Sequence, residues 1–223
     1  MAEHNFDLIT FDCYGTLIDW EQGIINAFQS EAASRGAELN AADIIAAYHE
    51  LEPVVETEKY TPYGEVLAET AQRVASRLGL QIPKTRAGFL ADSLPDWQPF
   101  PDTNAALERL ASRAKLGILS NIDDDLLAAT RRHFTVDFDL IVTAAQVKSY
   151  KPSEGHFLEA RRRISNERWL HAAQSYFHDV VPASRLNIPV AWVNRKGERA
   201  SERGPRPDFE VRNLTELAER LGF

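Results

Sequence analysis

The sequence contains a single cysteine, Cys13, among its 223 residues, so no disulfide bond can form within the chain. This scarcity is typical of proteins in a reducing compartment, and we expect a cytoplasmic location. No apolar run approaches the length of a membrane-spanning helix, so a membrane partner is not expected. Residues 1–7 are mostly polar and contain no basic segment followed by an apolar one, so no secretory signal is predicted.

Positive charge is also in the minority. Lys and Arg number 25 against 33 Asp and Glu, which gives a formal net charge of −8. An acidic surface argues against nucleic acid as a partner, although a local site can still bind a small anionic molecule. The histidines lack the His-x-x-x-His spacing of a zinc site. With 44% hydrophobic and 26% charged residues, the composition is that of an ordinary globular protein.

Short apolar runs, each followed by polar or turn residues, alternate with helix-like patterns. This alternation predicts β-α-β units and a parallel sheet, the α/β class. A fifth strand, with fewer apolar residues than the others, is predicted at 175–177. The runs that predict the other strands are 7–11, 116–119, 139–142 and 189–193.

Residues 22–90 show helical patterns only, which predicts a helical insertion after the first strand. The expected helices are 23–33, 41–51 behind an Asn40 cap, and 63–78 ending at Gly79. We therefore expect a Rossmann-like core formed by residues 1–19 and 96–223, with a helical cap formed by residues 20–95. The polar stretch 195–205 is predicted to be a solvated surface loop.

Polar side chains follow the predicted strands. Because the carboxyl ends of parallel strands meet at one edge of the sheet, these side chains are candidates to converge on one cleft. They comprise two aspartates, a lysine, hydroxyl groups, an amide and a histidine. In chain order they are Asp12 and Thr16, Ser120 and Asn121, Lys151, and then His178 and Asp179.

Taken singly, each of these residues also has a simpler interpretation. Asp12 and Asp179 suit turns or helix caps, and Ser120 suits the start of a helix. Lys151, before a proline, suits a surface charge, and His178 suits a partly buried, hydrogen-bonded histidine. The combination of all the clusters, in this order, argues for a site.

The combined pattern resembles the haloacid dehalogenase superfamily of hydrolases, which use an aspartate nucleophile. The segment FDCYGTL is similar to the first motif of that superfamily, ILSN to the second, KSYKP to the third and SYFHDVVPASRLNIP to the fourth. The resemblance covers nearly the whole chain. It implies Asp12 as the nucleophile, Thr16 as its positioning residue and Lys151 as the neighbouring positive charge. Cys13 is assigned to packing, since no His–Asn pattern accompanies it.

Tyr14 occupies the place where the phosphatases of this superfamily carry a second aspartate, which protonates an alkoxide leaving group. A tyrosine, with a reference pKa of about 10, is a poor acid near neutrality, and a halide needs no proton. Gln174 stands where those phosphatases carry a second acidic magnesium ligand. The pattern therefore resembles the 2-haloacid dehalogenase branch and implies no cofactor, although Asp12, a backbone carbonyl and Asp179 leave room for a weak Mg²⁺ site.

The resemblance implies that Asp12 displaces halide from a short 2-halo carboxylate, forming an aspartyl ester that water then hydrolyses to a 2-hydroxy acid. Asp179 and Ser175 orient the water. Dimers are common in this branch, so a homodimer is one option. The residues assigned to substrate binding are Tyr14, Trp20, Ser120, Asn121 and His178.

Three features depart from the dehalogenase pattern. The early cap helix, residues 40–51, has no arginine for the halide, and Tyr48, Lys59 or Tyr60 are candidate replacements. The fourth motif differs, and Phe157 stands in the place of a tyrosine.

Three alternatives stay open: a magnesium-dependent phosphatase, a hydrolase that opens a strained-ring acid, and a binding protein on a degenerate scaffold. Aromatic cap residues could line a pocket, although core packing is favoured for each: Trp20, Tyr48, Tyr60, Tyr63 and Trp97.

Overall fold

The computed structural model describes residues 6–58 and 60–223. The chain forms two compact units. The first, here called the sheet unit, contains the residues up to Ile18, Pro99–Asn121 and His133–Phe223. The second, the helical unit, contains Asp19–Gln98 and Ile122–Arg132. The segment 122–132 thus packs with the helices, whereas the sequence pattern grouped it with the core.

The sheet unit is built on six parallel strands in the order β3-β2-β1-β4-β5-β6. The first strand lies near the centre, between β2 and β4, and its residues are all buried. Helices cover the sheet, so the predicted Rossmann-like α/β class is confirmed. The strands are β1 (Leu8–Phe11), β2 (Lys115–Ser120), β3 (Leu140–Thr143), β4 (Trp169–Ala173), β5 (Val190–Val193) and β6 (Phe209–Val211).

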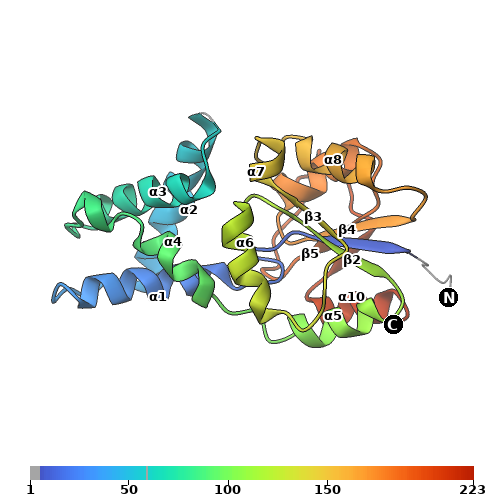
Figure 1. The fold of residues 1–223 in the computed structure, drawn as a ribbon, viewed down its shortest axis with the longest axis horizontal. Coiled ribbons are helices and arrows are strands. Elements are labelled where there is room, and N and C mark those ends of the chain that lie inside the picture. The colour runs from blue at the N-terminus through green and yellow to red at the C-terminus, as the bar shows by residue number, and fades with distance from the viewer. Residues whose placement is uncertain (1–5, 59) are drawn as a thin grey trace. The chain divides into compact units, whose positions relative to one another are not determined.

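Two layers of helices flank this sheet (Figure 1). On one face lie α5 (Thr103–Ala111) and α10 (Leu214–Arg220), and on the other lie α7 (Ala144–Val147) and α8 (Gly155–Arg163). The hydrophobic core on the α8 side joins side chains of α8, β3 and β5 to α9 (Val181–Arg185). This core includes the aromatic side chains of Phe157, Trp169 and Trp192.

The helical unit consists of helices alone within its described residues. The helix predicted at 41–51 begins at the expected cap, since the Asn40 side chain accepts a hydrogen bond from the amide of Ala42 at 2.8 Å. No helix in the described part of the chain is both long and apolar enough to cross a membrane. The helices are α1 (Trp20–Ala33), α2 (Ala41–Glu58), α3 (Tyr63–Arg77), α4 (Phe89–Ser93), α6 (Asp124–Thr130) and the 3-10 turns Lys84–Arg86 and Leu94–Asp96.

The prediction of a strand at 175–177 is wrong. The strand in this part of the chain is β4, residues Trp169–Ala173, and it ends before Ser175. The Ser175 side chain then caps one turn of π-helix, Tyr176–Val180, by accepting a hydrogen bond from the amide of His178 at 3.2 Å. Strand β4 contains two alanines, which are depleted in strands, and no β-branched residue, which hid it in the sequence.

Candidate active site

The chain makes a tight turn directly after β1, and this turn carries Asp12 and Thr16. Gly15, between them, has a φ of +96°, a conformation that side chains other than glycine rarely adopt. Its amide donates to the carbonyl of Ile18 at 2.8 Å. Cys13 is fully buried in the turn, and burial raises the pKa of its thiol well above the usual value. A thiol held protonated is a poor nucleophile, in agreement with the predicted packing role.

Both oxygens of the Asp12 carboxylate are held by neighbouring side chains. Thr16 Oγ1 donates to Oδ2 at 2.9 Å, and Lys151 Nζ donates to Oδ1 at 2.9 Å. Thr16 is itself fixed, because its hydroxyl accepts the backbone N–H of Gln174 at 2.9 Å. Asp12 is 8% exposed. The carboxylate is therefore oriented within the fold while retaining some access from outside.

Lys151 uses all three of its ammonium hydrogens inside the sheet unit. Besides Asp12, Nζ donates to Asp179 Oδ1 at 2.7 Å and to the carbonyl of Leu119 at 2.9 Å. Asn121 fixes the main chain of the lysine: its Oδ1 accepts the Lys151 amide at 2.7 Å and its Nδ2 donates to the Lys151 carbonyl at 3.1 Å. Asn121 thus positions Lys151, and its assigned role in substrate binding stays a prediction.

The charges of this cluster determine its pKa values. Burial raises the pKa of Asp12 above its usual value. The ammonium of Lys151 opposes this effect only in part, because it is shared with Asp179. Burial would also raise the pKa of Asp179, but Lys151 and the hydrogen bond from His171 outweigh burial and lower it. Burial would lower the pKa of Lys151, and the two carboxylates reverse this, so the lysine stays charged.

Ser120 offers a buried hydroxyl at the end of β2. It is 1% exposed, and its Oγ has no hydrogen-bond partner among the described residues. Its carbonyl oxygen lies 3.0 Å from Nε2 of His156, a fully buried ring. Burial lowers the pKa of His156 to about 3, so the ring is neutral and donates to this carbonyl. A buried, unpartnered hydroxyl on a fixed backbone suits the binding of a ligand.

The remaining predicted residues of the sheet unit lie in two places. Ser175 Oγ is 2.9 Å from Nδ1 of His178, and burial lowers the pKa of that histidine. Tyr14, half-buried in the turn after β1, pairs with Ile18 in an isolated β-bridge. The assigned roles of Tyr14, Ser175 and His178 stay predictions.

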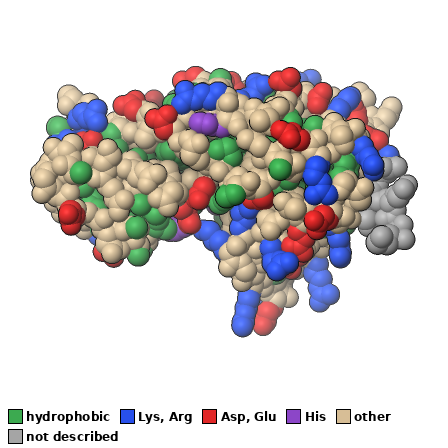
Figure 2. Space-filling view, turned by 90° about the horizontal axis from the view of Figure 1, so that it is seen from below, with side chains coloured by type: hydrophobic (Ala, Val, Ile, Leu, Met, Phe, Trp, Pro, Cys, Tyr) green, Lys and Arg blue, Asp and Glu red, His purple; other side chains and the backbone are tan. Residues whose placement is uncertain are grey.

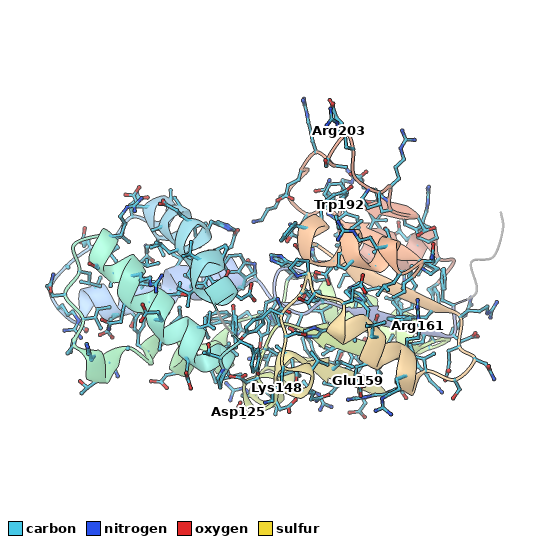
Figure 3. All side chains as sticks on the ribbon, turned by 90° about the horizontal axis from the view of Figure 1, so that it is seen from above. Asp125, Lys148, Glu159, Arg161, Trp192 and Arg203 are labelled. Carbon is cyan, nitrogen blue, oxygen red and sulfur yellow. The ribbon has the colours of Figure 1, made fainter. Side chains whose placement is uncertain are left out.

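The prediction of a wholly solvated loop at 195–205 is wrong at its first residue. The side chain of Arg195 is 11% exposed and forms a two-pronged ion pair with Asp102, with distances of 2.9 and 3.1 Å. It also donates to the carbonyl of Thr16 at 2.9 Å and lies over the ring of Phe100. These partners are distant in sequence, so only the fold reveals this role. Arg203 lies where the loop projects from the sheet unit (Figure 3).

Two of the predicted residues of the helical unit, Trp20 and Tyr48, pack against each other. The ring of Trp20 is 5.4 Å from that of Tyr48, and Tyr63 donates to Glu52 at 3.1 Å. Tyr48 and Trp97 are 3% and 5% exposed, which favours core packing over a pocket lining for these two. Lys59, a candidate replacement for the halide arginine, lies outside the described residues. The substrate-binding role of Trp20 stays a prediction.

A comparison with protein families assigns the chain. Residues 6–173 match the family model of haloacid dehalogenase-like hydrolases. The chain belongs to this family. The first three of the motifs quoted above lie within the matched residues, with the first motif at the end of β1.

Relatives within this family are similar over nearly their full length. An (S)-2-haloacid dehalogenase of Pseudomonas putida is 29% identical over 220 residues, covering 96% of both chains. A second (S)-2-haloacid dehalogenase, from Pseudomonas sp. (strain YL), is 26% identical and covers 95% of this chain and 92% of its own. A structure of L-2-haloacid dehalogenase from Xanthobacter autotrophicus, with chloropropionic acid covalently bound, superposes with a TM-score of 0.83 at 21% identity, covering 96% and 97%. The likeness to this structure shows the shared fold.

Proposed function

We propose that this chain is a dehalogenase that converts short 2-haloacids to 2-hydroxy acids through an aspartyl ester. The observation that carries the proposal is the Asp12 carboxylate, fixed by Thr16 and Lys151 at the end of β1 with a tyrosine two residues later. The activity named for the Pseudomonas relatives supports the same substrate class.

In the first step, Asp12 attacks the carbon that bears the halogen. A bond forms between a carboxylate oxygen and this carbon, the carbon–halogen bond breaks, and the configuration of the carbon inverts. The halide leaves with the bonding electrons and needs no proton, which suits Tyr14 in place of an acid. The unpartnered hydroxyl of Ser120 and neighbouring backbone amides bind the substrate carboxylate. Lys151 keeps the attacking carboxylate ionised.

In the second step, water attacks the carboxyl carbon of the aspartyl ester. The bond between this carbon and the ester oxygen, which came from Asp12, breaks, the 2-hydroxy acid leaves, and one proton is released. The product thus takes its new oxygen from Asp12, and Asp12 regains one from water. Asp179, whose Oδ2 is buried and has no partner among the described residues, orients the water together with Ser175.

The reaction as proposed needs no cofactor, because the ammonium of Lys151 supplies the positive charge between Asp12 and Asp179. Among the described residues, no group of three or more His, Cys, Asp or Glu is arranged to hold a metal ion.

The proposed partner is a small anionic acid rather than nucleic acid or a membrane. Acidic and basic side chains are both present on the face shown in Figure 2. A cytoplasmic location and a homodimer remain part of the proposal.

One panel of substrates tests the proposed function. The chain is assayed with 2-chloro- and 2-bromo-acids of increasing length, strained-ring acids and phosphomonoesters, each with and without a chelator, and D12N serves as the inactive control. We expect halide release that survives the chelator and is lost in D12N. Phosphate release that requires Mg²⁺ would favour the phosphatase alternative. Turnover of no acid, or turnover unchanged in D12N, would overturn the proposal.

A further inference from the structure

A row of buried polar groups crosses the sheet unit beneath Asp179. Asp179 Oδ1 lies 2.9 Å from Nε2 of His171, and Nδ1 of the same ring lies 2.9 Å from Thr10 Oγ1. The indole N–H of Trp169 donates to this hydroxyl at 2.7 Å. His171 and Thr10 are fully buried. Thr10, Trp169 and His171 lie outside the motifs quoted above, so the row is an addition to the site.

The sheet itself places the members of this row side by side. Thr10 of β1 pairs with His171 of β4 on one side and with Gly117 of β2 on the other. A Cβ atom at Gly117 would lie 3.0 Å from the methyl carbon of Thr10 and 2.9 Å from the carbonyl of Leu140. The missing side chain therefore leaves room for the methyl group, and Oγ1 is directed toward the histidine.

The donor inventory favours one direction for these hydrogen bonds. An indole N–H can only donate, so Thr10 Oγ1 accepts from Trp169. The hydroxyl of Thr10 has two partners among the described residues, and its own hydrogen therefore points to Nδ1 of His171. An accepting Nδ1 requires the hydrogen of a neutral ring to be on Nε2, facing Asp179. The chain of donors runs from Trp169 through Thr10 and His171 to Asp179.

This arrangement determines which oxygen of Asp179 is available. Oδ1 accepts from both His171 and Lys151, at 2.9 and 2.7 Å, and two donors from different directions restrict rotation of the carboxylate. Oδ2 is buried and has no partner among the described residues. The edge of the His171 ring packs at 89° to the ring of Phe157, with centroids 5.1 Å apart, so the imidazole is fixed as well.

We propose that His171 is a positioning residue for the second chemical step. In its Nε2–H tautomer, held by Thr10, it fixes Asp179 so that Oδ2 faces the water that hydrolyses the aspartyl ester. The inference rests on the proposed function for its chemical step, whereas the tautomer is a property of the ligand-free protein. The ring contacts Asp179, whereas Asp12 is held by Thr16 and Lys151, so we expect ester formation to depend on His171 much less than ester hydrolysis does.

Two matched substitutions test the role of the ring. In H171Q the side-chain amide places an N–H near the position of Nε2, whereas in H171N the amide reaches only the position of Nδ1. Ester formation and ester hydrolysis are timed separately, by mass spectrometry of the enzyme during a single turnover of a 2-chloro acid. We expect H171N to accumulate the ester because its hydrolysis slows about 10- to 100-fold, the effect of losing a hydrogen bond to a charged group. We expect H171Q to recover most of the rate.

Nitrogen NMR of the histidine rings in the ligand-free wild-type protein tests the tautomer without any substrate. We expect a neutral His171 ring with its hydrogen on Nε2; a doubly protonated ring, or one with hydrogen on Nδ1, would overturn the inference. Equal slowing of both chemical steps in H171N and H171Q would overturn it too. If the wild-type protein forms no ester with any 2-haloacid, the proposed function fails, and the NMR result still decides the tautomer.

Discussion

Lys151 Nζ lies 2.7 Å from Asp179 Oδ1 and 2.9 Å from Asp12 Oδ1, so one ammonium group serves two buried carboxylates. The unequal sharing separates the two acids. Asp179 also accepts a hydrogen bond from His171, and its pKa is lowered. The pKa of Asp12 is raised, so Asp12 is the more basic of the two carboxylates. Two carboxylates with different environments are suited to different roles, one as nucleophile and one as the orienting group for water.

Removal of the shared ammonium should be costly for both stability and activity. K151M leaves Asp12 and Asp179 buried without a positive charge, and we expect the free energy of unfolding to fall by about 3–5 kcal/mol. Activity should fall below detection. The matched control is K115M, which breaks the exposed Lys115–Glu167 pair at 2.9 Å and should cost at most about 1 kcal/mol. Urea unfolding of both variants provides the comparison, and similar losses would contradict the assigned role of the cluster.

The pH dependence of ester formation should reflect the raised pKa of Asp12. Only the ionised carboxylate attacks, so kcat/KM falls as the pH drops through this pKa, and the acid limb should lie above the usual range for Asp, about 4. T16V removes a hydrogen bond that favours the anion, and it should move the limb to higher pH. T135V, a change of a surface threonine that bonds Glu108, should leave the limb in place. A limb at or below the usual Asp range would contradict the description of Asp12.

Arg195 should contribute to both the fold and the geometry of the nucleophile turn. It ties Asp102 to the carbonyl of Thr16, and R195L would leave both acceptors without this donor. We expect a loss of about 1–3 kcal/mol in the free energy of unfolding, together with a lower kcat. R203A, on the projecting part of the same loop, should change neither quantity. Thermal unfolding and steady-state rates measure the two effects, and equal behaviour of both variants would argue against the Arg195 contacts.

Ser120 should matter for binding rather than for stability. Its hydroxyl has no partner among the described residues, so S120A removes no internal hydrogen bond and should leave the unfolding midpoint nearly unchanged while KM for the haloacid rises. T103V is the matched comparison, because Thr103 Oγ1 donates to the carbonyl of Leu17 at 2.8 Å. That variant should lose about 1 kcal/mol of stability and keep its KM. A stability loss in S120A with unchanged KM would reverse the interpretation.

Much of the sheet was predictable because most of its strands are apolar runs followed by polar residues. Strand β4 was not, because it contains His171 between leucine and alanine residues. The partners that make a buried histidine acceptable there are Thr10, 161 residues away in sequence, and Asp179. Strand β6, with three residues, was too short to give a pattern. In both cases the stabilising contacts are long-range.

The residues of the candidate site were likewise only partly predictable from the sequence. Asp12, Lys151 and Asp179 could be inferred to converge, because each follows a strand of a parallel sheet, and the structure brings them together. Arg195 and His156 could not be inferred, since a charged loop residue and a lone histidine carry no signal by themselves. Their partners, the carbonyls of Thr16 and Ser120, are backbone atoms, and only the fold places such atoms.

A single turnover in ¹⁸O-labelled water, with enzyme in excess over a 2-chloro acid, is the most direct test of the aspartyl ester. If Asp12 forms the ester and water attacks its carboxyl carbon, the first 2-hydroxy acid carries no label. The label should then appear in the peptide that contains Asp12. Label in the first product, with none in that peptide, would mean that water attacks the substrate directly and would contradict the account.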